Sequence, residues 1–148
     1  IPTRPHARAG FERILLVEDE AGLRRLAVEV LRGAGYVVTP AADGQTALDL
    51  LAAGDRPPDL VVTDVVMPRV GGVELAERLA VQHPEVPVLF MTGYVDQTSR
   101  QGLVGADVLI KPFVVTELVA RVEEALDRAG SGPGRSPASE IRAQGSKR

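Results

Sequence analysis

Short apolar runs alternate with helical patterns along the chain, and this alternation limits the possible folds more than any other feature. Each run is followed by apolar residues at helical spacing, although that spacing is weak over 96–104. Runs that are apolar on both faces are typical of strands in a parallel sheet, and right-handed crossovers between them place helices on both sheet faces. The sequence therefore predicts an α/β fold with a parallel sheet. The five predicted strands are 14–17, 36–39, 60–62, 86–91 and 108–110.

The chain divides into one domain with a short segment on each side. Residues 1–11 are rich in Pro, Arg, Ala and Gly and are predicted to be a linker. Residues 12–129 hold all five strand-and-helix units and are enough for a single buried core. Residues 130–148 have too few apolar side chains to order themselves, so we expect a flexible tail. The chain begins at Ile1 rather than Met, which suggests a part of a longer protein.

Composition excludes several classes of function. The 148 residues carry a formal charge of -3, and the basic residues form no patch that indicates direct contact with nucleic acid. There is no cysteine, which excludes disulfides and thiolate chemistry. No apolar run approaches the ~20 residues of a membrane-spanning helix, and the N-terminus lacks the apolar core of a secretory signal. We expect a cytoplasmic protein whose domain does not contact the membrane.

One stretch places an acid at the end of a buried strand. The apolar residues 60–62 lead to Asp64, and Pro68, Gly71 and Gly72 then turn the chain before the next helical pattern begins. In an open α/β sheet, ligands bind beyond the carboxyl ends of the strands, so an acid there is well placed for chemistry. The alternative is structural, because Asp also closes strands and caps helices.

Polar residues follow other predicted strands in the same way. Glu18 and Asp19 follow the first strand, Thr92 the fourth and Lys111 the fifth. Each has a structural alternative: Asp19 as a helix cap, Thr92 as a turn residue, and Lys111 as a solvated lysine before a proline. Together these alternatives do not account for three acids, a hydroxyl group and an ammonium group at one edge of a parallel sheet.

The electrostatics of such a cluster indicate a metal site. Like charges ~4 Å apart repel by roughly 4 kcal/mol at an effective dielectric near 20, so three carboxylates cannot all stay ionised unaided. A hard divalent cation relieves this repulsion, and without Cys or a suitably placed His the site favours Mg²⁺ over zinc. A metal ion, a lysine and a hydroxyl group can together neutralise a phosphoryl group in transfer. Asp64 would then be the nucleophile that forms an aspartyl phosphate.

Four motifs in order make the chain resemble the receiver domain of two-component response regulators. They are Leu16-Val-Glu-Asp-Glu20, the stretch from Asp64-Val-Val-Met-Pro68 to Gly72-Val-Glu-Leu75, Met91-Thr-Gly93, and Lys111-Pro-Phe113. The sequence Met91-Thr-Gly-Tyr94 is most similar to that of receivers at the C-terminus of hybrid histidine kinases. The resemblance implies a flavodoxin-like, doubly wound five-stranded sheet with strand order 2-1-3-4-5, the order shared by flavodoxin and a chemotaxis receiver.

The resemblance also implies a role for each site residue. Asp64 would accept a phosphoryl group from the phosphohistidine of a histidine kinase or a histidine phosphotransfer protein. Asp19 would bind Mg²⁺, or Mn²⁺ in its place, directly, Glu18 would bind it mainly through water, and the backbone carbonyl of Val66 would complete the protein ligands. Such a domain catalyses its own aspartyl phosphorylation and dephosphorylation in a phosphorelay and is a monomer or a weak dimer.

Two further roles and one backbone feature follow from the same resemblance. Lys111 would pair with Asp64 and later with a phosphate oxygen, and Thr92 would donate its hydroxyl to the phosphate. We also predict a cis peptide bond between Lys111 and Pro112, a state that is accessible only before proline.

The sequence departs from the family pattern in three places. Glu18 replaces the commoner Asp and is one methylene longer. Val108 stands where many members place the Tyr or Phe that moves inward on phosphorylation, so that relay is predicted to be absent. The segment between Thr92 and Lys111 is short, which leaves the fourth helix, and dimerisation through it, open.

Three hypotheses for function remain. The first is a phosphoacceptor switch, and the second is a receiver-like protein-interaction module that works without phosphorylation. The complete set of Asp19, Asp64, Thr92 and Lys111 disfavours the second. The third is a metabolic phosphatase with an aspartate nucleophile, which is disfavoured because Val66 stands where such enzymes carry a second Asp. The two histidines, in the linker and before Pro84, are predicted to be surface residues.

Overall fold

The computed structural model describes residues 12–93 and 106–129. The predicted linker 1–11, the predicted tail 130–148 and the weak helical segment 96–104 lie outside the described residues. The elements in chain order are β1 (Arg13–Val17), α1 (Ala21–Gly33), β2 (Val37–Ala41), α2 (Gly44–Ala53), β3 (Leu60–Asp64), α3 (Gly72–Gln82), β4 (Val88–Thr92), β5 (Asp107–Ile110) and α5 (Val115–Ala129).

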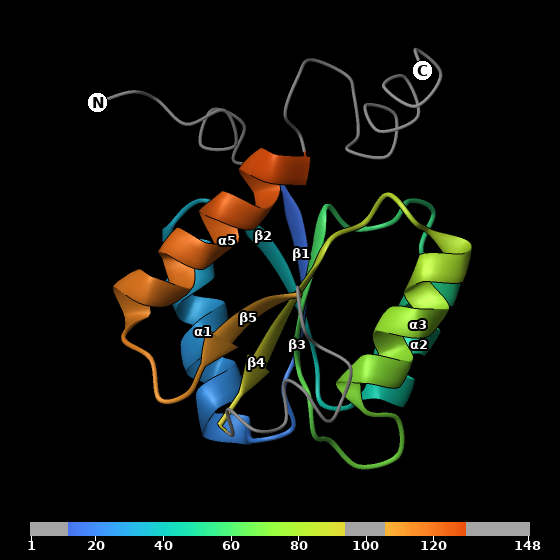
Figure 1. Cartoon of the computed structure of the whole chain (residues 1–148), viewed down its shortest axis with the longest axis horizontal. Coiled ribbons are helices and arrows are strands. Elements are labelled where there is room, and N and C mark those ends of the chain that lie inside the picture. The colour runs from blue at the N-terminus through green and yellow to red at the C-terminus, as the bar shows by residue number, and fades with distance from the viewer. Residues whose placement is uncertain (1–11, 94–105, 130–148) are drawn as a thin grey trace.

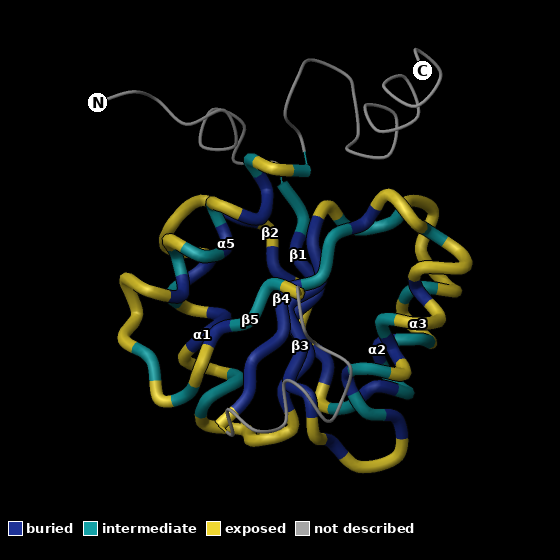
Figure 2. The backbone as a smooth tube through the Cα atoms, viewed as in Figure 1, coloured by how far each residue is buried: buried dark blue, intermediate teal, exposed yellow. Residues whose placement is uncertain are grey.

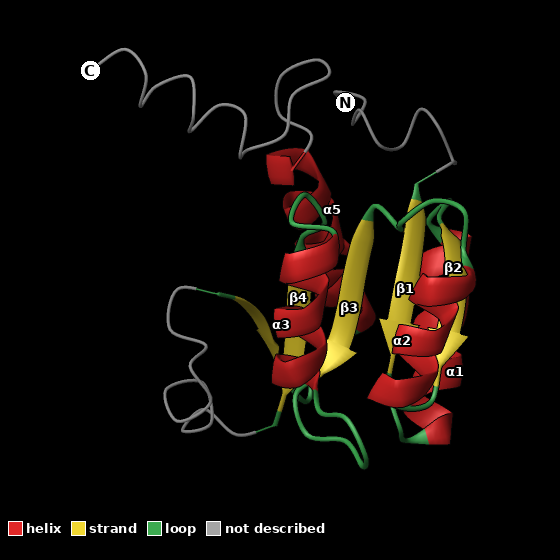
Figure 3. Cartoon of the chain, turned by 90° about the vertical axis from the view of Figure 1, so that its right-hand side faces the viewer, coloured by secondary structure: helices red, strands yellow, loops and turns green. Residues whose placement is uncertain are grey.

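The five strands form one sheet in the order β2-β1-β3-β4-β5, and every neighbouring pair is parallel. In Figure 3 the arrowheads of β1, β2 and β3 point to the same edge of the molecule. This confirms the predicted flavodoxin-like, doubly wound topology. Because β1 and β3 are neighbours, the residues that follow them lie side by side at the carboxyl edge of the sheet.

Helices cover both faces of the sheet. Figure 1 shows α1 and α5 together on one face and α2 and α3 on the other. Each pair encloses its own apolar cluster: Leu31 and Val122 pack with Leu16 on the first face, and Leu79 packs with Val61 on the second. The central strands β1, β3 and β4 are almost wholly buried, the edge strands β2 and β5 are partly exposed, and the helices expose their outer faces (Figure 2). The parallel sheet thus explains why the predicted strands are apolar on both sides.

Two predicted strands have shifted ends. The second runs from Val37 to Ala41 rather than over 36–39, passing through Pro40. Val37 donates its N–H to Glu12 on the β1 side, so alternation along the strand turns the Pro40 nitrogen to the open edge, where no hydrogen bond is lost. The fourth strand runs from Val88 to Thr92 rather than over 86–91, because Val86 still donates to His83 in the turn after α3.

No helix among the described residues combines the length and the hydrophobicity that crossing a bilayer requires.

Candidate functional site

The sheet register brings the ends of four strands to one place. Val17, the last residue of β1, is opposite Thr63, so Glu18 follows beside Asp64. On the other side of β3, β4 ends at Thr92, whose carbonyl oxygen accepts a hydrogen bond of 2.7 Å from the Lys111 backbone N–H. The sheet order therefore gathers residues that are far apart in sequence.

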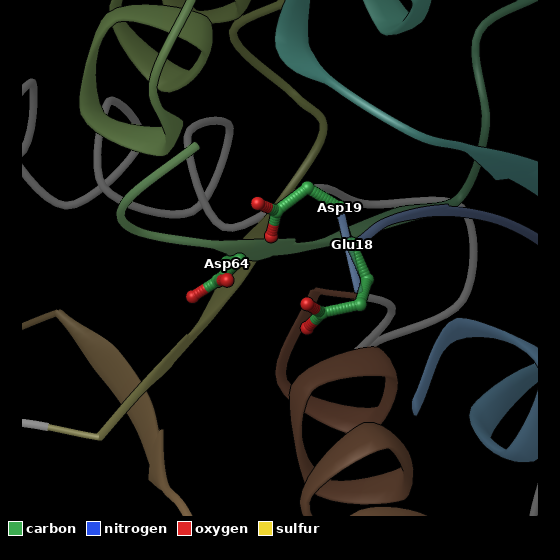
Figure 4. A group of neighbouring side chains, drawn as sticks. All are labelled: Glu18, Asp19 and Asp64. Atoms are coloured by element: carbon green, nitrogen blue, oxygen red, sulfur yellow. The ribbon is translucent and has the colours of Figure 1, made fainter. Parts of the chain in front are cut away.

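Three carboxylates meet at this edge. Glu18, Asp19 and Asp64 each offer an oxygen that lies within 4.8 Å of the other two. Figure 4 shows Glu18 and Asp19 leaving the end of β1 and Asp64 leaving the end of β3 beside them. Glu18 and Asp64 are buried and Asp19 is exposed, so the cluster has one side open to solvent. The three acids lie together as the strand order led us to expect.

The Lys111 ammonium is shared between two of these acids. Its Nζ lies 3.0 Å from Glu18 Oε1 and 3.2 Å from Asp64 Oδ2, and its side chain is 22% exposed. The prediction that Lys111 pairs with Asp64 is confirmed, and the alternative of a solvated lysine is wrong. Sequence reasoning missed the shorter contact with Glu18. The signal was the extra methylene of Glu relative to Asp, which lengthens the reach of this side chain.

Burial dominates the acidity of the site. It raises the pKa of Asp64 and of Glu18, because water is removed from their charged forms. Lys111 and hydrogen bonds from nearby backbone N–H groups oppose this effect without cancelling it. Burial alone would lower the pKa of Lys111, but the hydrogen bond to Glu18 and the charge of Asp64 outweigh it and raise the pKa. The site holds more negative charge than its single lysine neutralises.

The backbone around Glu18 fixes its side chain. Glu18 Oε2 accepts a hydrogen bond of 3.1 Å from the Glu20 backbone N–H, and the Glu18 carbonyl accepts one of 2.8 Å from Arg24. The N-cap of α1 is Glu20, whose side chain accepts from the Leu23 N–H at 2.6 Å. The alternative in which Asp19 caps this helix is therefore wrong, and its carboxylate faces the cluster instead.

Close packing positions the loop after Asp64. A Cβ on Gly72 would stand 2.2 Å from the Asp64 carbonyl oxygen, so only glycine allows α3 to begin this close to β3. On the far side of the loop, Arg69 adopts a left-handed φ of 69° and forms an ion pair of 2.8 Å with Asp43, the N-cap of α2. The loop that carries Val66 is thus held at both ends.

Thr92 lines a cleft that also reaches Asp64 of the acid cluster. The cleft has a volume of about 640 Å³, and Asp64, Thr92 and Lys111 supply its polar lining. Val66, two residues after Asp64, is exposed and contributes to the rim. Apart from Gly93, which follows β4, the remaining lining is apolar and comes from α1, the loop after β5 and α5. Sequence reasoning did not anticipate this cleft.

The remaining predictions concern the peptide bond before Pro112, the side chain at Val108 and the two histidines. The predicted cis bond between Lys111 and Pro112 is confirmed. Val108 is partly buried against Val65 and Phe90, so the position expected to lack an aromatic relay is filled by a small side chain in the sheet. His83 lies beside Glu85 after α3, and the other histidine lies outside the described residues.

The chain is similar to known proteins over most of its length. A profile of the response regulator receiver domain matches residues 14–123. The alkaline phosphatase synthesis transcriptional regulatory protein SphR of Synechococcus elongatus is 41% identical over 145 residues, which are 90% of this chain and 56% of that protein. The response regulator receiver protein CpdR of Brucella abortus is 37% identical over 119 residues, 78% of this chain and 98% of that protein. The chain thus spans about half of SphR, a longer relative.

Solved structures agree with these sequence matches. The response regulator TrrA of Thermotoga maritima, solved in complex with Mg²⁺ and BeF, has a TM-score of 0.70 and 30% identity, covering 77% of this chain and 98% of that one. The receiver domain of the hybrid histidine kinase CckA has a TM-score of 0.66 and 36% identity over the same shares of the two chains. Because fold, strand order and sequence agree over most of its length, the chain belongs to the family of response regulator receiver domains of two-component systems.

Proposed function

We propose that Asp64 accepts a phosphoryl group and that its phosphorylation switches the surface of this receiver domain between two states. One observation carries the proposal: Asp64 is buried at the end of β3, with Lys111 Nζ 3.2 Å away and two further carboxylates within 4.8 Å. A buried carboxylate beside an ammonium group is well placed to act as a nucleophile toward a phosphoryl group.

The donor set fits Mg²⁺, or Mn²⁺ in its place. Three carboxylates supply hard oxygen ligands, and the metal-binding cluster in the described part of the chain includes no histidine. We assign direct ligation to Asp19 and Asp64, a water-mediated role to Glu18 and the backbone carbonyl ligand to Val66. When bound, the ion would neutralise the charge of the carboxylates and of the phosphoryl oxygens.

The side chains of the site divide the transfer step between them. A carboxylate oxygen of Asp64 attacks phosphorus as the bond from phosphorus to the donor imidazole nitrogen breaks. The ring, which carries a proton on its other nitrogen, leaves with that electron pair as neutral imidazole. The Lys111 ammonium group exchanges its ion pair with Asp64 for one with a phosphoryl oxygen, while its contact with Glu18 keeps it beside the site. Thr92, which lines the same cleft, donates its hydroxyl to the phosphate. That hydrogen bond links phosphorylation to a change at the end of β4.

The phosphodonor in this proposal is a histidine kinase or a histidine phosphotransfer protein. The similarity to the receiver of a hybrid histidine kinase supports a place in a phosphorelay in the cytoplasm. We propose residues 12–129 as the receiver domain, present as a monomer or a weak dimer, and residues 1–11 and 130–148 as its flanking linker and tail.

Acetyl phosphate tests the proposal directly. The protein is incubated with Mg²⁺ and acetyl phosphate, and intact mass is measured with and without EDTA. We expect a phosphate-sized gain that requires the metal and is absent in Asp64→Asn. The matched control is Asp55→Asn, which removes an exposed carboxylate in the bend after α2 and should retain the gain. A wild-type protein that gains no mass with acetyl phosphate or a phosphohistidine donor would favour an interaction module that works without phosphorylation.

A further inference from the structure

An apolar cleft extends from the phosphoacceptor site across one face of the domain. Its polar end is formed by Asp64, Thr92 and Lys111, and its volume is about 640 Å³. That volume is typical of pockets that bind small molecules, which are ~300–1,000 Å³. Its long walls are α1 on one side and the β5–α5 loop and α5 on the other, the two helices that lie together in Figure 1.

The walls of this cleft are almost entirely apolar. They are formed by Leu23, Leu26, Ala27 and Val30 of α1 and by Pro112, Phe113, Val115 and Leu118. Leu26 is 47% exposed and Val115 is 43% exposed, so part of this apolar surface faces water. Of the described residues that line the cleft, Lys111 alone carries a positive charge. With the Mg²⁺ of the proposed function at the three carboxylates, the lining suits a molecule with a dianionic head at Lys111 and an apolar body along α1.

We propose that the cleft binds the hydrocarbon part of a small phosphodonor, so that medium-chain acyl phosphates phosphorylate Asp64 faster than acetyl phosphate does. This inference rests on the proposed function, because it assigns a substrate class to the same site. The phosphoryl group meets Asp64 and Lys111 at the polar end, and the acyl chain lies between Leu26 and Val115.

The reaction with such a donor balances without another reactant. A carboxylate oxygen of Asp64 forms a bond to phosphorus, and the bond between phosphorus and the acyl oxygen breaks. The electron pair leaves with the acyl oxygen as a fatty carboxylate, so no proton is transferred. The hydrocarbon of this leaving group stays in the cleft while the new aspartyl phosphate forms, and the carboxylate then departs through the open side.

The structure also sets the size of the expected preference. Full burial of a methylene favours binding about fourfold, and a chain in a cleft open on one side loses roughly half of its contact with water, which leaves about twofold per methylene. Hexanoyl phosphate has four methylenes more than acetyl phosphate, so its rate at subsaturating concentration should be roughly 15-fold higher.

The test compares initial rates of mass gain with acetyl and hexanoyl phosphate at the same Mg²⁺ concentration. We expect a roughly 15-fold preference for hexanoyl phosphate in the wild type, reduced several-fold in Leu26→Gln, because a polar side chain replaces one of the apolar α1 side chains that contact the acyl chain. The matched control is Val81→Gln, a similar change at a side chain of α3 that is 83% exposed on the other face of the sheet. It should keep the preference.

A binding measurement adds a readout that is independent of phosphoryl transfer. With Mg²⁺ present, hexylphosphonate should shift the backbone amide resonances of α1 and the start of α5, and methylphosphonate should not. Equal rates with both donors, or a preference that Leu26→Gln leaves unchanged, overturns the inference while phosphorylation of Asp64 still supports the proposed function. If neither donor phosphorylates Asp64 and hexylphosphonate shifts no resonance, the inference fails, and the phosphohistidine donor then decides the proposed function separately.

Discussion

Replacing Asp64 by Asn should make the metal-free protein more stable, although it removes the proposed phosphoacceptor. Three carboxylates in this site face a single ammonium group. Asn keeps the shape of the side chain and removes one buried charge, and Lys111 retains its 3.0 Å contact with Glu18. Functional sites commonly hold groups in arrangements that reduce the stability of the folded protein. A gain in stability when such a group is removed is therefore expected.

The distances give the magnitude. At an effective dielectric near 20, repulsion between Asp64 and Glu18, whose oxygens lie within 4.8 Å, is at least about 3 kcal/mol. Attraction between Asp64 and Lys111 at 3.2 Å is about 5 kcal/mol. Asp19 adds further repulsion, screened by water because its side chain is exposed. These charge terms nearly offset one another, so the cost of burying Asp64 decides the balance, and we expect a gain of about 1–2 kcal/mol.

The stability gain of Asp64→Asn should increase as the pH rises. Burial raises the pKa of Asp64 above its ordinary value of 3.8, so the folded protein binds this proton more tightly than the unfolded chain. The stability contributed by Asp64 is therefore complete below about pH 4 and is lost as the pH rises through the folded pKa. The advantage of Asp64→Asn should be small near pH 4 and larger at pH 7.5.

Thermal unfolding followed by circular dichroism between pH 4 and 7.5 measures this difference, with EDTA present. A gain of 1–2 kcal/mol corresponds to a rise in melting temperature of roughly 5 °C for a domain of this size. The control Asp55→Asn makes the same change of charge at an exposed position and should lie within about 0.5 kcal/mol of the wild type. An Asp64→Asn protein that melts no higher than the wild type at pH 7.5, or whose advantage is the same at pH 4, would refute the reasoning.

Three further predictions concern the packing, a helix cap and the lysine. Gly72→Ala should lower the free energy of unfolding in urea by about 2–3 kcal/mol, because its Cβ would stand 2.2 Å from the Asp64 carbonyl oxygen. Gly33→Ala, whose Cβ meets nothing within 4 Å, should instead raise it by about 0.5–1 kcal/mol; equal effects of the two changes would contradict the packing argument. Asp43→Ala should lower the melting temperature at pH 7, and the loss should shrink below pH 4, because the Thr46 N–H and then Arg69 hold the pKa of Asp43 at about 2; melts that differ as much at pH 3 as at pH 7 would count against this. Lys111→Ala should bind Mg²⁺ no more weakly than the parent in calorimetric titration while phosphorylation no longer changes the amide spectrum, and weaker binding would show that the role of Lys111 is misassigned.

Local pattern was enough to predict the secondary structure because each element buries its own face. Apolar periodicity placed all five strands and the four described helices. The shifted ends of β2 and β4 depend on which backbone groups find hydrogen-bond partners, as at Pro40 and Val86. Those partners belong to other segments of the chain, so periodicity alone cannot locate the ends.

The meeting of Glu18, Asp19 and Asp64 was also predictable from the sequence, because parallel strands bring their carboxyl ends to one edge whatever the side chains are. The bridge from Lys111 to Glu18 joins residues that are 93 positions apart. It depends on the length of two side chains and on where β5 ends, and these are set by packing.

The sequence alone therefore determined the fold class, the edge of the sheet that carries the acids and the membership of the four motifs in one site, since periodicity and strand direction are properties of the chain itself. Only the tertiary structure decided how Lys111 divides its charge between two carboxylates, how closely Gly72 approaches Asp64, and that an apolar cleft opens beside the site. The physical reason is that these features are distances between segments that meet only after the helices have packed on the sheet.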